Sequence, residues 1–189
     1  HDVLRKIGGG AYGEVWLARG VTGALRAVKV VWREDFEDER GFEREFEGIL
    51  KFEPISRDHP ALVNILHVGR GTYGGAFYYY VMELGDDVST GREINPIEYQ
   101  PRTLRGDKPQ APVERWDTDE CVDVGLRLAE ALGHLHENGL AHRDVKPSNI
   151  IFVNGRAKGK NIKGWNDLPG LIDPAGKGDL TFKVHDVGF

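Results

Sequence analysis

The stretch that decides the fold is His142-Arg143-Asp144-Val145-Lys146-Pro147-Ser148-Asn149. It places a carboxylate, an ammonium two residues later and a carboxamide five residues later at fixed spacing. Asp144 can accept a proton from a hydroxyl nucleophile, Lys146 can hold a negative phosphoryl oxygen, and Asn149 offers an oxygen to a hard cation such as Mg²⁺. Pro147 fixes one backbone angle and removes a donor, so we expect a rigid loop here.

This octapeptide resembles the catalytic loop of eukaryotic-like protein kinases, with Val145 in the position of the family's Leu. Lys146 after the Asp resembles the serine/threonine kinases, and the general pattern looks like bacterial members of the family. A plain loop with a capping Asp and a solvated Lys is the simplest alternative. A zinc site on His142 and Asp144 is another, but the chain has one Cys and no second His at ligand spacing nearby.

Composition sets the outer limits of the interpretation. The chain has 189 residues, enough for one large domain or two small lobes. Its net charge of −5 does not favour a nucleic-acid partner. The single Cys121 excludes an intramolecular disulfide and suggests a reducing, cytoplasmic location. The sequence contains no run of about eighteen apolar residues, which a membrane-spanning helix would require. The chain begins at His1 and ends at Phe189 inside a motif, so we expect a fragment of a longer kinase.

The segment Val3–Arg19 alternates apolar and polar residues around a glycine cluster, which predicts strand, turn and strand. Gly8, Gly10 and Gly13 form G-x-G-x-x-G, which is a weak signal by itself. A dinucleotide-binding fold requires a helix after the third glycine, whereas Glu14–Ala18 has a β pattern. A glycine-rich hairpin lets backbone N–H groups approach phosphates without Cβ clashes, although a flexible β-turn stays an alternative.

The run Leu25–Val31 predicts a strand that carries one cation, Lys29. Because its neighbours are apolar, we expect Lys29 to point into a sheet face or cleft, where a buried ammonium needs an anion. Ala27-Val28-Lys29 matches the lysine motif of kinase strand 3. The resemblance supplies two anions, the phosphates of ATP and a glutamate on the next helix. A solvated lysine on an edge strand is the alternative.

The acidic segment Asp35–Phe52 predicts an amphipathic helix that Pro54 ends. At about 100° per residue, Glu45 lies roughly 60° from Phe42, at the border of the apolar arc. Glu45 is thus the acid best placed to reach Lys29, and it matches the family's helix C glutamate. It can also be one more charge on a solvated helix face.

A turn and a strand are predicted within His59–Leu66, and an aromatic strand within Phe77–Leu84. In kinases the second strand enters the hinge between the lobes, so Met82 matches the gatekeeper, a reading compatible with an ordinary core methionine. The resemblance implies that the Glu83 and Leu84 backbones bind the adenine edge. The residues that it assigns to ATP binding are Ile7, Gly8, Gly10, Gly13, Val15, Ala27, Lys29, Met82, Glu83 and Leu84.

From Gly85 to Trp116 prolines and polar residues predict a long connection without regular structure, whose role is open. A helix is expected after Asp117, with Cys121 as a small buried hydrophobe on its apolar side. Ile150–Val153 predicts a strand, and the glycine- and proline-rich residues 156–179 show little periodicity.

Near the end, Asp186-Val187-Gly188 resembles the Asp-Phe-Gly metal motif, with Val in place of Phe. The number of residues between Asn149 and Asp186 is much greater than is typical of the family. Either the hairpin loop between them is enlarged, or the match of Asp186 to the motif is a coincidence. Asp173 is a poorer rival, because Pro174 follows it. A surface aspartate in a turn is the remaining alternative for Asp186.

The order of these motifs implies an α+β, protein-kinase-like bilobal fold. We expect an N-terminal β-rich lobe with helix C over residues 1–84, a polar connection or insertion over 85–116, and an incomplete helical lobe over 117–189. The resemblance implies a serine/threonine-protein kinase (EC 2.7.11 type) that moves the γ-phosphoryl of ATP to a protein hydroxyl.

In that scheme Lys29, held by Glu45, binds the phosphates, and Asn149 and Asp186 hold Mg²⁺. Asp144 orients and deprotonates the acceptor hydroxyl, and Lys146 holds an oxygen of the transferred phosphoryl group. A pseudokinase-like nucleotide-binding or scaffold module without phosphotransfer is the alternative, favoured by Val187 and the long 156–179 segment. A small-molecule phosphotransferase of related fold is a more remote one.

Overall fold

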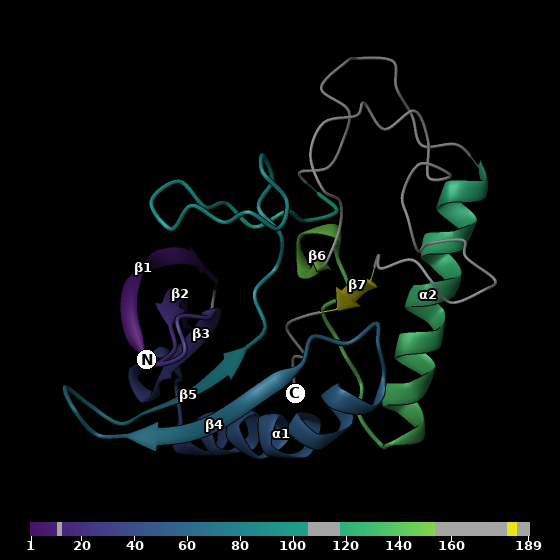
Figure 1. Ribbon diagram of the computed structural model, residues 1–189. Helices are drawn as coiled ribbons and strands as arrows, with labels where there is room; N and C mark the ends of the chain where they lie inside the picture. Colours follow the sequence, from purple (N-terminus) through teal and green to yellow (C-terminus); the bar gives the residue numbers. More distant parts are fainter. Residues whose placement is uncertain (11–12, 106–117, 154–180, 185–189) are drawn as a thin grey trace. The chain divides into compact units, whose positions relative to one another are not determined.

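The computed structural model describes residues 1–10, 13–105, 118–153 and 181–184 (Figure 1). The described chain falls into two compact units. The first comprises His1–Asp58 and Val63–Leu84. The second comprises His59–Leu62 and the described residues from Gly85 onward. No helix in the described part is long and apolar enough to cross a membrane.

The first unit is built on one five-stranded antiparallel sheet of order β1-β2-β3-β5-β4. Its strands are β1 (Asp2–Gly9), β2 (Glu14–Arg19), β3 (Leu25–Trp32), β4 (Ile65–Gly71) and β5 (Phe77–Met82). The predicted strand, turn and strand around the glycines and the predicted strands near residues 25–31 and 77–84 are confirmed. The strand expected within His59–Leu66 is displaced, because pairing with β5 begins only at Ile65.

The two faces of this sheet bury different sets of side chains. On one face Ala18, Val28 and Val81 form a small core cluster with Val30 and Tyr79. The opposite face carries Tyr78, which is buried and contacts two aromatic rings of helix α1 (Glu39–Asp58). The Tyr78 ring centroid lies 5.2 Å from that of Phe42 and 5.3 Å from that of Phe46. Helix α1 therefore packs on the Tyr78 face of the sheet.

Helix α1 follows a short 3-10 turn, Arg33–Asp35, and continues past the predicted end, because Pro54 lies inside it. The prediction that Pro54 ends the helix is wrong. Phe52 and Ser56 on either side of the proline are 2% and 0% exposed, so the last turn is held by its burial. The residue four positions before the proline, Leu50, is 47% exposed, and water can solvate a carbonyl there that lacks its helical donor.

The second unit contains helix α2 (Thr118–Glu137), the 3-10 turn η2 (Pro147–Asn149) and the antiparallel pair β6 (Ile150–Val153) and β7 (Thr181–Val184). Helix α2 buries Val124, Ala131 and Leu135. Cys121, predicted to be buried, is exposed on its first turns, as are Val122 and Leu126. The apolar side of α2 is thus covered from Val124 onward, and Cys121 lies before that part.

The described part of the predicted connection, residues 85–105, contains no helix or strand, as predicted, but it has a defined conformation. Isolated β-bridges join Asp87 to Gly91, Asp87 to Pro101 and Thr103 to Ile151. Tyr99 is 1% exposed, and Asp86, Asp87 and Arg102 are buried as well. The segment therefore folds on its own buried polar groups and pairs with β6.

Candidate active site

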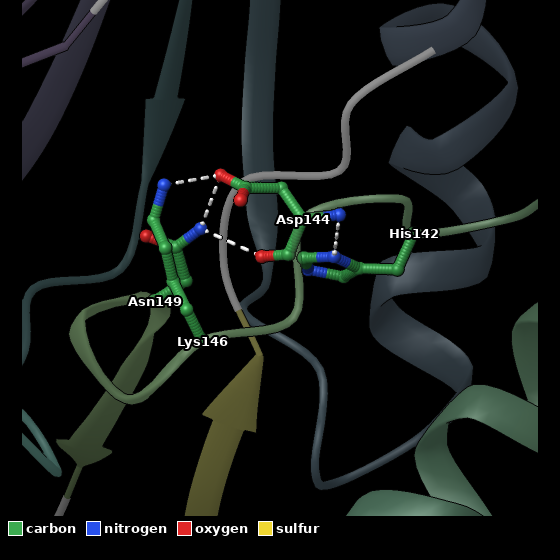
Figure 2. A network of polar contacts seen from close by, with 4 residues as sticks. All are labelled: His142, Asp144, Lys146 and Asn149. Carbon is green, nitrogen blue, oxygen red and sulfur yellow. Dashed lines mark hydrogen bonds and ion pairs between the residues drawn. The ribbon is translucent and has the colours of Figure 1, made fainter.

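The loop between α2 and β6 gathers the reactive groups of the octapeptide around the Asp144 carboxylate (Figure 2). Lys146 Nζ lies 2.6 Å from Asp144 Oδ2, and Asn149 Nδ2 donates to the same oxygen at 2.9 Å. Asn149 Nδ2 also donates to the Asp144 carbonyl oxygen at 2.9 Å. The Lys146 and Asp144 side chains are 51% and 46% exposed, so the carboxylate is held by these neighbours and is partly accessible to solvent.

Backbone geometry fixes the position of Asp144. Its N–H donates to the His142 carbonyl at 2.8 Å and lies 3.3 Å from His142 Nδ1. The His142 side chain is 2% exposed and anchors the loop, while Arg143 between them has a φ of 60°, in the left-handed region. Such a conformation is uncommon for a residue with a side chain and marks a constrained loop. The loop therefore presents Asp144 in a set direction.

Of the two predicted Mg²⁺ ligands, Asn149 has a conformation that suits a hard cation. Asn149 is buried, and its amide nitrogen is directed to Asp144, which leaves the amide oxygen as the atom suited to Mg²⁺. The second predicted ligand, Asp186, lies outside the described residues, as does the rival Asp173. No cluster of three His, Cys, Asp or Glu side chains suited to a metal occurs in the described ranges.

The glycine-rich hairpin joins β1 to β2, and two of its glycines differ in their surroundings. A Cβ on Gly13 would lie 2.3 Å from the Val30 carbonyl oxygen, and this residue has a φ of +90°. A Cβ on Gly10 would meet nothing within 4 Å. Gly13 is thus required by the fold, whereas the open side of Gly10 is a place where a phosphate can approach the backbone.

Strand register places several predicted nucleotide-binding residues on one face of the sheet. Val15 pairs with Lys29, and Lys29 pairs with Tyr80. Two residues along, Leu17 pairs with Ala27, and Ala27 pairs with Met82. Directly opposed residues and residues two apart share a face. The predicted residues on this face are Val15, Ala27, Lys29 and Met82.

Tyr78 lies on the same face as Lys29, so helix α1 packs on the face that carries the lysine. The Lys29 Nζ lies 5.9 Å from the ring centroid of Tyr80, and the side chain is half-buried. Glu45 is also half-buried and lies between Phe42 and Phe46, the two residues that contact Tyr78. Helix and sheet thus bring both residues to one interface, and the ion pair between them stays a prediction.

At the end of β5, Met82 is buried and therefore a core residue, and its role as gatekeeper stays a prediction. The next residue is engaged within the unit, because the Glu83 N–H donates to the Asn64 carbonyl at 3.1 Å. Its Oε1 accepts from the Asn64 N–H at 2.6 Å. If the Glu83 backbone binds adenine, its carbonyl oxygen is therefore the atom that would accept the hydrogen bond. Leu84 is half-buried, Ile7 lies in β1, and Gly8 pairs with Val15.

Sequence reasoning missed two groups of polar contacts. Lys6 Nζ lies 2.6 Å from Glu14 Oε1 across the glycine hairpin, and Trp16 Nε1 donates to Glu14 Oε2 at 3.2 Å. The hydrogen bond from Lys6 lowers the pKa of Glu14. The other group surrounds Asp87. For Lys6 and Glu14 the strand pattern was a usable signal, since they flank a hairpin. For Asp87 the Ser and Thr that follow it are a local turn signal, but no local signal indicates its bond to Gln100.

Comparison with known proteins agrees with this arrangement. The model of the protein kinase domain family matches residues 1–163. The serine/threonine-protein kinase PrkC of Bacillus subtilis is 28% identical over 152 residues, which cover 80% of this chain and 20% of that protein. The serine/threonine-protein kinase PknF of Mycobacterium tuberculosis is 28% identical over 198 residues, or 99% of this chain and 36% of that protein. The chain therefore spans well under half of the length of these relatives.

A plant relative and a solved structure give the same picture. Cyclin-dependent kinase G1 of Arabidopsis thaliana is 34% identical over 162 residues, which cover 80% of this chain and 22% of that protein. The crystal structure of the Mycobacterium tuberculosis PknI kinase domain matches with a TM-score of 0.60 at 19% identity, covering 98% of this chain and 58% of that domain. That likeness shows the fold alone. The chain belongs to the protein kinase family.

Proposed function

We propose that the protein containing this chain transfers the γ-phosphoryl group of ATP to serine or threonine hydroxyls of a protein substrate. The observation that carries the proposal is the Asp144 carboxylate, oriented by Lys146 at 2.6 Å and by Asn149 at 2.9 Å and 46% exposed. A carboxylate so held can orient an acceptor hydroxyl and accept its proton. The lysine beside it can offset charge on the transferred group.

The remaining roles are assigned by family and by position on the sheet. Lys29, with Glu45 from α1, would bind the α and β phosphates, and the glycine hairpin would cover them. Mg²⁺, held by Asn149 and Asp186, would offset negative charge on the phosphates. The relatives named serine/threonine-protein kinases, together with Lys146 two residues after Asp144, support hydroxyls of serine and threonine as acceptors.

The test is Asp144→Asn in the full-length protein, with Asp119→Asn, an exposed aspartate on α2, as the matched control. Loss of a general base lowers turnover by about 10²- to 10⁴-fold. We expect Asp144→Asn to lose phosphotransfer by that factor and to keep ATP affinity, while Asp119→Asn retains both. Turnover would be followed with radiolabelled ATP, affinity by calorimetry, and the acceptor type by phosphoamino-acid analysis.

Three outcomes separate the alternatives. Unchanged turnover in Asp144→Asn would refute the role of Asp144. Phosphotyrosine as the product would refute the serine/threonine assignment. Mg²⁺-dependent ATP binding without any transfer by the unmodified protein would select a nucleotide-binding module that has the kinase fold and no kinase activity.

A further inference from the structure

The loop that follows β5 is folded around one buried carboxylate. Asp87 is 5% exposed. Its Oδ1 accepts from the N–H groups of Ser89 and Thr90, at 2.8 and 3.0 Å, and from the Thr90 hydroxyl at 3.2 Å. Its Oδ2 accepts from the Gln100 N–H at 2.8 Å. One side chain thus ties the start of the loop to a residue thirteen positions later.

Further contacts close the same loop. Asp87 and Gly91 exchange two backbone hydrogen bonds, and the Val88 N–H donates to the Gln100 carbonyl at 2.9 Å. The buried Tyr99 donates its hydroxyl to the Gly85 carbonyl at 3.0 Å. Burial raises the pKa of Asp87, but the hydrogen bonds from Gln100, Ser89 and Thr90 outweigh burial, so the pKa lies below its usual value. The carboxylate is therefore ionised at neutral pH and accepts all four bonds.

The two ends of this loop are joined to strand β6. The Asp86 N–H donates to the Phe152 carbonyl at 2.8 Å, and the Arg102 N–H donates to the Asp86 carbonyl at 2.8 Å. The Phe152 N–H donates to the Arg102 carbonyl at 3.1 Å. The Arg102 guanidinium lies over the Phe152 ring, 4.1 Å from its centroid. Both ends of the loop therefore meet at one buried residue of β6.

From Arg102 the chain continues along β6 toward the candidate active site. The Leu104 N–H donates to the Ile150 carbonyl at 2.9 Å, and the Arg105 N–H donates to the Pro147 carbonyl at 3.1 Å. Pro147 begins the turn that contains Asn149, and Ile150 follows Asn149 directly. The backbone on both sides of Asn149 is therefore bonded to the segment whose start Asp87 organises.

We propose that Asp87 is a positioning residue for the active site. Through the loop 85–105 it fixes the backbone on both sides of Asn149, and so holds the amide of Asn149 against Asp144. The catalytic importance of this positioning rests on the proposed function, in which Asn149 is a Mg²⁺ ligand. The structural coupling does not rest on it. A partner that displaced this loop would thereby change the position of the Asn149 amide without touching it.

The test compares Asp87→Asn with Glu98→Gln in the full-length protein. Asp87→Asn removes an acceptor that faces the Gln100 N–H. Glu98 is an exposed carboxylate on the same loop that accepts from the Asn95 amide, three residues before it. Amide hydrogen exchange would be measured without metal or nucleotide. Loss of one hydrogen bond to a charged group should raise exchange about tenfold at the donor amides of Leu104, Arg105 and Phe152 in Asp87→Asn alone.

A second variant, Tyr99→Phe, removes only the hydroxyl that donates to Gly85, and serves if Asp87→Asn does not fold. It should raise exchange at the same amides, by a smaller factor. The coupling is refuted if the increase stays within residues 85–101, if Glu98→Gln gives the same increase, or if exchange rises equally throughout α2, which would indicate general destabilisation.

A Mg²⁺ titration supplies the functional readout. Changes to groups that orient a metal ligand weaken metal binding by about tenfold or more, so the Mg²⁺ concentration for half-maximal ATP binding should rise by that factor in Asp87→Asn. An unchanged Mg²⁺ requirement beside altered exchange would refute the positioning role. Absence of phosphotransfer in the unmodified protein would refute the proposed function and leave the exchange result standing.

Discussion

At the scale of single residues, Gly13 is the position where the backbone itself sets the residue type. Its φ of +90° lies in the region that favours glycine. A Cβ there would also lie 2.3 Å from the Val30 carbonyl oxygen and 3.0 Å from a methyl group of Val31. Because Val30 belongs to the neighbouring strand of the sheet, the clash cannot be relieved by one side chain turning away.

We therefore expect Gly13→Ala to lower the free energy of unfolding by about 2 kcal/mol or more, from backbone strain and overpacking. Gly10→Ala is the matched control, since a Cβ there meets nothing within 4 Å. It should change stability by less than about 0.5 kcal/mol. Urea unfolding followed by tryptophan fluorescence measures both. Equal stability of Gly13→Ala and the unmodified protein would contradict the described hairpin.

The reactive residues differ in how far sequence reasoning could place them. Asp144, Lys146 and Asn149 lie within one short loop, so their spacing alone brings their side chains together. The buried Asp87 depends on Gln100, thirteen residues away across a loop without periodicity, and no local pattern encodes such a contact. Cys121 was predicted to be buried because the helical pattern begins near it, but burial on α2 begins only at Val124.

At the scale of elements, the junction between α1 and β4 depends on one hydroxyl. Ser56 is 0% exposed, donates to the Glu53 carbonyl at 2.7 Å and accepts from the Ile65 N–H at 2.9 Å. Ile65 is the first residue of β4 and is 2% exposed. The serine therefore satisfies a buried donor at the point where the sheet begins its last strand.

Ser56→Ala should destabilise the protein by about 1–3 kcal/mol, because the buried N–H of Ile65 loses its acceptor. The control is Ser89→Ala, an exposed serine whose change should stay within about 0.5 kcal/mol. Thermal unfolding by circular dichroism measures both variants. Hydrogen exchange at Ile65 that is no faster in Ser56→Ala would count against this role.

The strands of the first unit were predictable because each one alternates or concentrates β-branched and aromatic residues between clear turns. The end of α1 was not, since Pro54 is a strong stop signal locally and is overridden by the burial of Phe52 and Ser56. The start of β4 was also displaced. Pairing with β5 is a long-range contact, as is the bond from the Asn64 N–H just before β4 to the Glu83 side chain, nineteen positions away.

At the scale of the whole molecule, the order of the motifs carried the family assignment, and the family model agrees over residues 1–163. The sheet adds that Val15, Ala27, Lys29 and Met82 share one face, so the proposed nucleotide-binding residues of these strands lie on the same side of the sheet. The absence of helices and strands from residues 85–105 was predicted correctly. Their specific conformation could not be predicted, because it arises from long-range polar contacts and not from an apolar pattern.

A nucleotide that binds the folded chain must stabilise it. At a Mg²⁺–ATP concentration one hundred times the Kd, the free energy of unfolding should rise by about 2.7 kcal/mol. We expect Lys29→Met to abolish most of this gain, since it removes the ammonium that we propose binds the phosphates. Lys51→Met, on the exposed side of α1, should keep it. Thermal shift with and without nucleotide checks both, and an undiminished shift in Lys29→Met would exclude Lys29 from the site.

The left-handed backbone of Arg143 has a consequence for anyone who wishes to make this protein more heat-resistant. A residue with a side chain pays roughly 1 kcal/mol for that conformation, which glycine adopts freely. Replacement by glycine would remove the backbone strain of the folded state and raise the conformational entropy of the unfolded chain. The two effects on the free energy of unfolding therefore oppose each other. Asparagine, which tolerates the same geometry, is the better choice for an engineer, although it discards an exposed guanidinium next to Asp144.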